Sequence, residues 1–536
     1  RHSDGKMVTE MHTVTANSKR KHQHLPPVVT PQYVVFTADK DLDNRTDLYL
    51  AMLDGSAVYR LNDPLVPGGG VYQFKISPDR RYVAYLADQD TDNVAELYVA
   101  NADGSGVTRV SGDLVSGGGV YDMAWAPDSS RLAYRAEQDT DGVAELFVAH
   151  ADGTGISRVS GDLVFGGDVW DYAWAPDNSR LAYRADQNTD DVIELFVSRS
   201  DGTDNVRVSG ALIAGSWGVN NFAWAPDSTQ VAYTAWQLTT RTPELFTSYP
   251  DGTGNVRVSH PLPSDYDYIS GDFYWAPDSS RIAYRAYYNY YYSSGGTYYV
   301  YYAENLYTTR PDGTGTTQVS VVPVRYDEYR NLSSVKWAPD SSRIAYIAEQ
   351  DTDNVMELYS SGPDGSSNVR VSGSLVADGD VYYDIAWAPD SSRIAYRADQ
   401  LTDNVYELFT SDPIGNGNVR VSGSLVTDGD VYNFAWSPDG LYLAYEADQL
   451  IDNRWELYTA TPDGSLNPRV SGPMAYNGNV AGFAWSQDGS RLVYRADQLV
   501  DEQYELFVAA PDGNAINDNI SGTLTANGDV YNFATQ

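Results

Sequence analysis

The stretch Met123-Ala-Trp-Ala-Pro-Asp-Ser-Ser-Arg-Leu-Ala-Tyr134 decides the fold of this chain, because close copies of it recur along nearly its whole length. Nine copies are present, and their aspartates are separated by intervals of 49 to 62 residues. A nearly fixed period of this size indicates one supersecondary unit repeated, with each copy burying a face on its neighbours. The nine aspartates are Asp79, Asp128, Asp177, Asp227, Asp278, Asp340, Asp390, Asp439 and Asp488.

Each repeat divides into four predicted strands. In the copy around Asp128, Pro127-Asp-Ser-Ser130 has the composition of a tight turn, and Asp152-Gly153 is a hairpin signal. Four short antiparallel strands in about 45 residues are typical of a propeller blade. The sequence therefore predicts an all-β protein, a β-propeller of four-stranded blades. The strands expected in this copy are residues 120–125, 131–136, 145–150 and 157–160.

The two ends of the chain together supply one further blade. Residues 33–61 have the pattern of a second, third and fourth strand, and residues 529–536 that of the missing first strand. Nine whole blades and this shared blade predict a single ten-bladed ring over residues 33–536, closed without an open sheet edge. Two smaller propellers satisfy the same count. We favour one ring because no Pro/Ser-rich linker interrupts the middle of the chain, where the longest interval comes from an insertion at residues 287–303.

The repeat resembles a known family through Trp387-Ala-Pro-Asp-Ser-Ser-Arg-Ile-Ala-Tyr396 and Trp436-Ser-Pro-Asp-Gly440. These segments are similar to the TolB-type propeller repeat, whose core is Trp-Ser-Pro-Asp-Gly followed by a hydrophobic strand. The resemblance extends from Tyr33 to the end of the chain and implies a propeller fold. Such repeats occur in periplasmic and surface binding proteins and in the substrate-gating propellers of peptidases. The resemblance is to the repeat and not to TolB itself, in which a six-bladed ring is joined to an α/β domain.

Composition predicts a protein that works outside the cytoplasm. The 536 residues contain 36 Lys and Arg against 73 Asp and Glu, a formal charge of −37, and no cysteine. Such a surface repels nucleic acid and anionic lipid, and no apolar run reaches the roughly 18 residues of a membrane span. We expect neither a nucleic-acid partner nor membrane insertion. The start at Arg1, without a signal-peptide core, predicts a processed end and an extracellular, cell-surface or periplasmic location.

Residues 1–32 differ from the rest of the chain. They hold five Lys or Arg, two acids and four of the six histidines, so they form a slightly basic arm on an acidic body. One interpretation is a disordered leader. The other is an arm that docks on a neighbouring protomer, because Met7-Val-Thr-Glu-Met-His-Thr-Val-Thr15 alternates like a strand and suits pairing with a partner's sheet edge. The second interpretation predicts self-association through the arm.

An acidic loop between the second and third strands is the one recurrent cluster of chemically suggestive residues. Alternating carboxylates in a tight loop direct several oxygens toward one point, and Ca²⁺ takes six to eight oxygen ligands. The alternative is that these residues only form Asx turns in an exposed hairpin. The calcium interpretation predicts the ligands Asp39, Asp41, Asp43, Asp88, Asp90, Asp92, Glu137, Asp139, Asp141, Asp186, Asn188, Asp190, Glu349, Asp351 and Asp353.

Two further recurrent residue types are predicted to be structural. An acid begins every third strand, even where the Asp triplet is lost, and we expect it to pair with the arginine of the fourth strand. The tryptophan of the first strand is expected to pack in the core. The arginines are Arg60, Arg109, Arg158, Arg207, Arg257, Arg370, Arg420 and Arg469. The tryptophans are Trp125, Trp174, Trp224, Trp275, Trp337, Trp387, Trp436 and Trp485.

The insertion at residues 287–303 has the pattern of an extended, tyrosine-rich hairpin. Tyrosine supplies rigid amphipathic contact area and is favoured at interfaces and on sugar-binding surfaces. The pattern predicts contact with a glycan or protein ligand. The alternative is a hairpin that only covers its own blade. The partner-binding candidates are Tyr288, Tyr290, Tyr291, Tyr292, Tyr298, Tyr299 and Tyr301.

The chain carries no recognised catalytic motif. Gly-x-Ser-x-Gly, His-Glu-x-x-His, P-loop and dinucleotide fingerprints are all missing from the sequence, and we assign no catalytic residue. We therefore expect a secreted or cell-surface propeller that binds or assembles without catalysis, as the subunit of an extracellular filament or surface layer. The alternative is a polysaccharide hydrolase or lyase with its site at the propeller axis, because two carboxylates suffice for glycoside hydrolysis.

Overall fold

The structure is a computed structural model. It describes residues 32–239, 242–263, 267–294, 297–320, 332–352, 354–514 and 517–535. Every regular element in these residues is a β-strand, and none of them forms a helix long and apolar enough to cross a membrane. Residues 1–31 of the predicted arm and the predicted ligand Asp353 lie outside the described residues.

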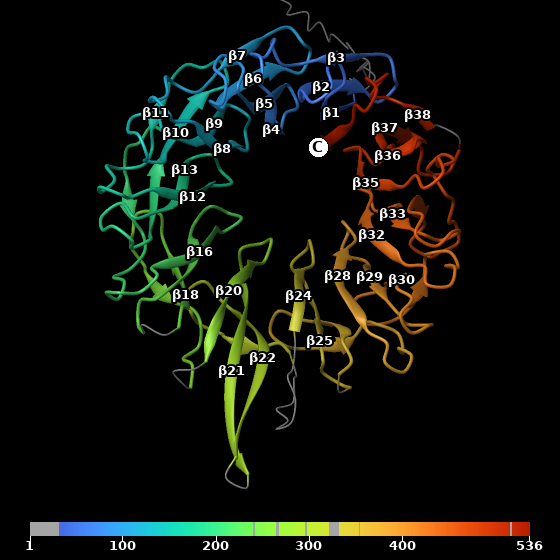
Figure 1. The fold of residues 1–536 in the computed structure, drawn as a ribbon. Helices are drawn as coiled ribbons and strands as arrows, with labels where there is room; N and C mark the ends of the chain where they lie inside the picture. Colours follow the sequence, from blue (N-terminus) through green and yellow to red (C-terminus); the bar gives the residue numbers. More distant parts are fainter. Residues whose placement is uncertain are drawn as a thin grey trace, which may run out of the picture.

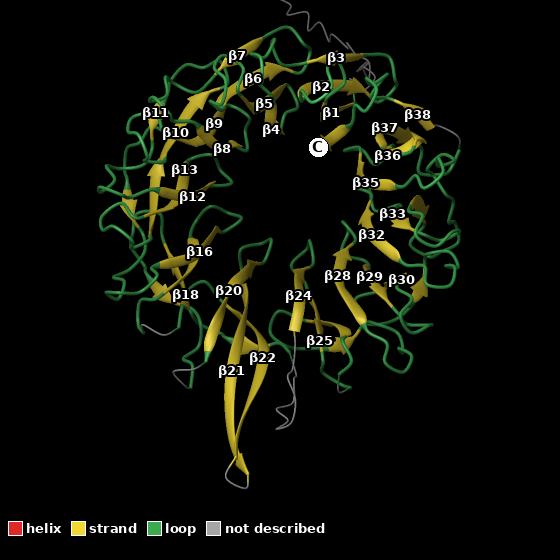
Figure 2. Ribbon diagram, in the orientation of Figure 1, coloured by secondary structure: helices red, strands yellow, loops and turns green. Residues whose placement is uncertain are grey.

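Ten antiparallel sheets form a closed ring, as predicted (Figure 1). Nine sheets have four strands. The sheet of blade 9 has three strands, and the single bridge Tyr458–Arg469 stands in place of its fourth. Figure 2 shows that the whole ring is built of strands and loops. The first strand of each blade lies nearest the axis, and the fourth lies at the outer edge (Figure 1). The chain is therefore one ten-bladed β-propeller and not two smaller ones.

The strands follow in blade order, with blade 1 made by both ends of the chain. The first strands are β39 (Val530–Ala534), β4 (Val71–Ile76), β8 (Val120–Trp125), β12 (Val169–Trp174), β16 (Val219–Trp224), β20 (Tyr268–Trp275), β24 (Leu332–Trp337), β28 (Val381–Trp387), β32 (Val431–Trp436) and β35 (Val480–Trp485). The second strands are β1 (Tyr33–Ala38), β5 (Tyr82–Ala87), β9 (Arg131–Ala136), β13 (Arg180–Ala185), β17 (Val231–Ala235), β21 (Ile282–Ser294), β25 (Ile344–Ala348), β29 (Ile394–Ala398), β33 (Leu443–Ala447) and β36 (Leu492–Val500).

The outer half of each blade is a hairpin of the third and fourth strands. The third strands are β2 (Asp47–Met52), β6 (Glu96–Asn101), β10 (Glu145–His150), β14 (Glu194–Arg199), β18 (Glu244–Ser248), β22 (Thr297–Thr309), β26 (Glu357–Ser361), β30 (Glu407–Ser411), β34 (Glu456–Ala460) and β37 (Gln503–Ala509). The fourth strands are β3 (Val58–Arg60), β7 (Val107–Arg109), β11 (Ser157–Arg158), β15 (Val206–Arg207), β19 (Val256–Arg257), β23 (Thr317–Gln318), β27 (Val369–Arg370), β31 (Val419–Arg420) and β38 (Asn517–Asn519).

The C-terminal strand closes the ring as predicted. The sheet of blade 1 runs β3-β2-β1-β39, and Phe36 lies opposite Phe533 in its antiparallel register. Val530 is fully buried in a cluster that also contains Val508 of blade 10 and Val34 of blade 1. The two ends of the chain are thus joined by backbone pairing and by a shared apolar core.

The hydrophobic core is divided among the contacts between neighbouring blades. The cluster between blades 2 and 3, for example, joins Leu97 and Val99 to Leu132 and Tyr134. The first-strand tryptophans extend these contacts with a hydrogen bond: Trp125 Nε1 donates to the carbonyl of Lys75 in the preceding blade at 2.9 Å. The other seven tryptophans donate in the same way at 3.0–3.3 Å. Their predicted packing role is confirmed, with a polar contact that the sequence did not predict.

The fourth strands are shorter than predicted, because serine side chains replace part of the ladder. Residues 157–160 were expected to be a strand, but β11 covers only Ser157–Arg158. Beyond it, the Ser160 hydroxyl accepts a hydrogen bond from the backbone N–H of Leu146 at 3.2 Å. A side chain that satisfies a neighbouring backbone group competes with regular pairing. The ladder between the third and fourth strands therefore ends in a side-chain hydrogen bond.

Candidate functional site

The predicted metal loops lie on one face of the ring, here called the loop face, where the second-to-third and fourth-to-first loops meet. In six of these loops the first acid is an aspartate that is buried and binds two backbone amides. The carboxylate of Asp88, 1 % exposed, accepts from Gly70 N at 2.5 Å and from Asn93 N at 3.3 Å. Asn93 has a left-handed backbone (φ 60°), so this bond holds a turn that costs conformational energy. The same two bonds recur at Asp39, Asp186, Asp399, Asp448 and Asp497.

A second set of side chains, four carboxylates and one amide, ties five of the ten blades to the preceding blade. The backbone N–H of Asp168, just before β12, donates to the carboxylate of Asp186. The carboxylate of Asp168 accepts from Ala144 N of blade 3 at 2.7 Å. Asp380, Asp430, Asn479 and Asp529 make the equivalent bond to the preceding blade at 2.7–2.8 Å. Burial raises the pKa of Asp380 and of Asp430. These side chains therefore brace blades 4, 8, 9, 10 and 1 on the backbone of the preceding blade.

The remaining predicted ligands are arranged differently. Asp41, Asp43, Asp90, Asp92, Asp139, Asp141, Asn188, Asp190 and Asp351 are exposed, whereas Glu349 is buried and Glu137 half-buried. Glu137 accepts from Gly142 N at 3.0 Å and from the Tyr121 hydroxyl. Within the described residues, no three His, Asp or Glu side chains gather as a metal cluster. Calcium binding stays a prediction. The bonds of the buried first acids are not Asx turns, because those of Asp88 run to Asn93 N, five residues on, and to Gly70 N, 18 residues earlier.

A pair of substitutions compares the buried first acid of a loop with an exposed acid of the same loop. Asp88→Ala is expected to lower the free energy of unfolding by about 2–4 kcal/mol, because two backbone N–H groups lose their charged acceptor. The matched control Asp90→Ala should stay within about 0.5 kcal/mol, because Asp90 is exposed. Denaturant melts measure both changes, and equal effects would contradict a structural role of the buried Asp88 carboxylate.

The same melts in excess chelator test calcium binding: only a lowered denaturation midpoint supports it.

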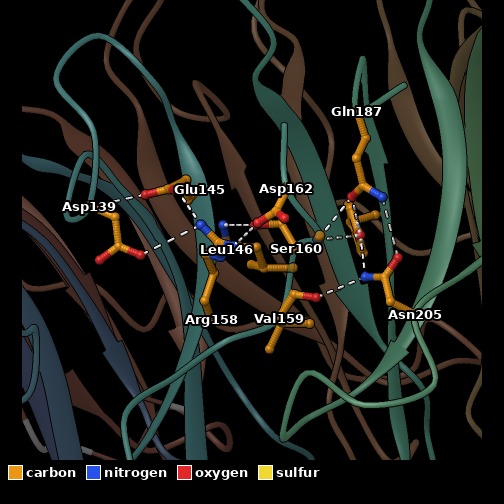
Figure 3. Close-up of polar contacts among 11 residues, drawn as sticks. Asp139, Glu145, Leu146, Arg158, Val159, Ser160, Asp162, Gln187 and Asn205 are labelled. Atoms are coloured by element: carbon orange, nitrogen blue, oxygen red, sulfur yellow. Dashed lines mark hydrogen bonds and ion pairs between the residues drawn. The ribbon is translucent and has the colours of Figure 1, made fainter. Parts of the chain in front are cut away.

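The predicted cross-strand ion pairs are present. Figure 3 shows the pair of blade 3, where Arg158 reaches Glu145 at 3.0 Å and also contacts Asp139 and Asp162. All eight predicted arginines pair with the acid that begins the third strand, at 2.6–3.9 Å. The acids are almost fully buried, so the pairs fix the geometry of the outer hairpins. Their persistence in blades without the Asp triplet agrees with a structural role.

An arginine in the second strand was missed by the sequence analysis. Arg135 bonds Asp122 of its own blade at 2.5 Å and the carbonyl of Val169 in the next blade at 2.9 Å. Arg184, Arg285, Arg397 and Arg495 make the same contact to the following blade at 2.8–3.2 Å. The available signal was an arginine at one fixed register of an otherwise apolar, buried strand. A buried charge requires a hydrogen-bonding or ion-pair partner, and here one of the partners is a backbone carbonyl of the next blade.

Blade 9 carries Glu446 at this arginine position. Its side chain is 4 % exposed, and its Oε1 has no hydrogen-bond partner among the described residues. Burial raises the pKa of Glu446 to about 7, although a backbone hydrogen bond from Gly482 acts in the opposite direction. A carboxyl group here therefore changes charge near neutral pH.

This position predicts a pH dependence of stability. The folded-state pKa of Glu446 lies above that of an unfolded glutamate, so folding takes up a proton between about pH 4.5 and 7. Stability is then lost as the pH rises through that window, by roughly 3 kcal/mol in all. Glu446→Gln should raise the melting temperature at pH 8 and change it little at pH 5. A variant with the same pH profile as the parent chain would contradict the assignment.

The tyrosine-rich insertion forms the predicted hairpin of β21 and β22. Tyr288 is buried in its own blade, and its hydroxyl lies 2.5 Å from Nε2 of His260 and 2.9 Å from the hydroxyl of Tyr307. Register pairs Tyr290 with Tyr301 and Tyr292 with Tyr299. The side chains of the other partner-binding candidates, Tyr290, Tyr291, Tyr292, Tyr298, Tyr299 and Tyr301, lie outside the described residues.

Comparisons with known proteins find similarity only to solved structures, at low sequence identity. No protein-family model and no curated protein matches the chain. Among solved structures, it is similar to a eukaryotic initiation factor (14 % identity, 82 % of this chain and 96 % of that one, TM-score 0.45). It is also similar to Porphyromonas gingivalis dipeptidyl peptidase 4 (12 %, 75 % and 60 %, 0.47) and to TolB from Acinetobacter baumannii (12 %, 53 % and 62 %, 0.27). The propeller fold that the TolB-type repeat implies is shown by the ten sheets themselves, and the family resemblance stays a prediction.

Proposed function

We propose that this chain is a non-catalytic binding and assembly protein, the subunit of an extracellular filament or surface layer. The observation that carries the proposal is the ribbon made by β21 and β22, which projects beyond the outline of the ring (Figure 1). Each of its strands is 13 residues long, against five or six in most equivalent strands of the other blades. Nothing in the architecture of a single blade requires this extra length.

The outer part of the ribbon has two open edges within the described residues. β21 pairs with β20 only as far as Tyr287, and β22 pairs with β23 only at Tyr307 and Thr308. Further along these edges, Asn289 N and Leu306 N still donate to the side chains of Asp267 and Ser320. Beyond them the two strands pair only with each other, out to Ser294 and Thr297. A lone two-stranded ribbon is marginally stable in water, and its free N–H and C=O groups form a template for another strand. A ribbon of this kind suits a partner that adds to its edge.

The basic arm is the segment of the chain best suited to that edge. Its five Lys or Arg and two acids stand against a body with a formal charge of about −40. Residues 8–14 alternate between apolar and polar types, as a strand added to a sheet edge does. In the proposed assembly, charge draws the arm of one protomer to the acidic surface of the next, and backbone pairing fixes it there.

Sedimentation of three forms of the protein tests the proposal: the full chain, a chain without residues 1–30, and a chain in which residues 289–302 are replaced by Asn-Gly. The third form shortens the ribbon to a two-residue hairpin turn and leaves the blade itself intact. Loss of higher-order species in both altered forms supports assembly through arm and ribbon. A full chain that sediments as a monomer at low salt would overturn it.

A further inference from the structure

The loop face carries an unequal set of aromatic side chains beside the axis. The second residue of the first strand is an exposed aromatic in several blades, for example Tyr72 at 57 %, Trp170 at 53 % and Tyr432 at 64 %. A different position, just before the third-strand acid, is aromatic only at Tyr406, Trp455 and Tyr504. These three residues belong to the consecutive blades 8, 9 and 10. Where blades 8 and 9 meet, the repeats therefore carry aromatic side chains at a position that is not aromatic in most other blades.

The two aromatic positions enclose a pocket between blades 8 and 9. The pocket has a volume of about 570 Å³, within the roughly 300–1,000 Å³ of small-ligand pockets. Tyr382 and Tyr406 meet edge to face with their ring centroids 5.2 Å apart, and Tyr432 and Trp455 are also 5.2 Å apart. Its lining is Tyr382, Tyr383, Asp384, Arg397, Tyr406, Asp430, Val431, Tyr432, Asn433 and Trp455. Four tyrosines and one tryptophan in a single pocket are far more than one blade contact needs for packing.

The polar groups of the pocket are held in place by the braces between blades. Arg397 donates to Asp384, to the Val431 carbonyl at 2.8 Å and to the Tyr432 carbonyl at 2.5 Å. Its guanidinium also lies 4.4 Å from the centroid of the Tyr382 ring. Asp430 accepts from Tyr406 N at 2.7 Å with one carboxylate oxygen. The aromatic rings thus lie beside polar side chains that hydrogen bonds hold in place, as a preorganised binding site requires.

The charged residues of the pocket, Asp384, Arg397 and Asp430, disfavour a cationic ligand. Arg397 already occupies a face of Tyr382, where an external cation would gain its cation–π attraction. Asp384 is neutralised by the same arginine, which leaves Asp430 as the only acid without an ion-pair partner in the lining. What remains accessible is aromatic surface, tyrosine hydroxyls, the Asn433 amide and one carboxylate. This combination suits a ligand with apolar C–H faces and many neutral hydroxyl groups.

We propose that the pocket between blades 8 and 9 binds a neutral saccharide. Sugar rings would stack on Tyr432 and Trp455, while Asp430 and Asn433 would exchange hydrogen bonds with hydroxyl groups. A smaller counterpart of about 240 Å³ lies between blades 3 and 4, lined by Tyr121, Arg135, Asp168 and Trp170 among others. There Ala144 stands where blade 8 has Tyr406, so one aromatic wall is missing and we expect weaker binding. The proposal concerns a ligand site and does not depend on assembly.

The test uses the full chain and a panel of neutral oligosaccharides: the hexamers of cellulose, xylan, mannan, laminarin and amylose, with hexalysine as the cationic probe. Calorimetry and tryptophan fluorescence report binding, because Trp455 lines the pocket. At least one hexasaccharide is expected to bind, and Tyr432→Ala and Trp455→Ala should each weaken it by about tenfold or more. Tyr432 is 64 % exposed, so its truncation leaves folding intact even if that of Trp455 does not.

The matched control is Tyr476→Ala, which removes an aromatic residue that is 87 % exposed on the loop face and lies outside the pocket. The affinity of this variant for the hexasaccharide should stay within about twofold of the affinity of the parent chain. Three outcomes would overturn the proposal: no hexasaccharide bound at roughly 10 mM, equal affinity in the pocket and control variants, or hexalysine binding that only the pocket variants lose.

Discussion

Removing residues 530–536 lowers the melting temperature by roughly 5–10 °C and makes the protein aggregate. The deletion takes away β39, the inner strand of blade 1, and with it the register Phe36–Phe533. It also removes the fully buried Val530 and the hydrogen bond from the Thr535 hydroxyl to the Trp485 carbonyl at 2.6 Å. β1 would become an open edge, and an unprotected edge strand invites pairing with other chains.

Thermal melts and light scattering measure both effects. Removing Gln536 alone is the control, because it leaves the whole of β39 in place. Arg495→Ala gives a second comparison, since it removes the donor to the Val530 carbonyl at 3.1 Å without opening the sheet. An unchanged melting temperature and unchanged solubility after the seven-residue deletion would show that blade 1 does not depend on the C-terminal strand.

Much of the fold could be predicted because the repeat combines short apolar strands with unambiguous turns. The turn at Asp128 forms as expected: its carboxylate accepts from Ser130 N at 2.9 Å, while Ser129 adopts the left-handed φ of 63°. Nine copies of such a pattern leave few alternative topologies. The shared blade was predictable because the two ends of the chain carry complementary parts of one repeat.

The role of the acidic loops could not be predicted in the same way. Asp88 binds Gly70 N, which lies 18 residues earlier in the sequence, and Asp168 binds an amide of another blade. Backbone N–H groups leave no mark on the sequence, so a carboxylate that binds them has the same pattern as one that binds a cation. The pocket between blades 8 and 9 was hidden for a related reason: Tyr382 and Tyr432 are 50 residues apart and line one pocket only when the blades pack.

Removing residues 1–30 is expected to convert higher-order assemblies into single rings. The arm carries five basic residues against two acids, and opposite charges draw it to the acidic body. Salt should have a graded effect in the same direction, because the screening length falls from about 30 Å at 0.01 M to about 10 Å at 0.1 M. The arm is long enough for this role, since about 30 extended residues span up to roughly 100 Å.

Sedimentation velocity at several salt concentrations measures the assembly, with the melting temperature as a control for folding. The truncated chain should melt like the parent, because all the strands of the described blades lie between Tyr33 and Ala534. Replacing Lys19, Arg20 and Lys21 with Gln is a milder variant and should weaken assembly without abolishing it. An oligomer that survives the truncation unchanged would exclude the arm and leave the ribbon as the contact to examine.

Electron cryomicroscopy of the full-length protein at low salt tests the account most directly. It predicts ten-bladed rings joined into a regular assembly, with the ribbon of β21 and β22 in contact with a neighbouring ring and an added strand along its edge. Isolated rings with a bare ribbon, in a preparation that sediments as 59.0 kDa monomers, would contradict the account.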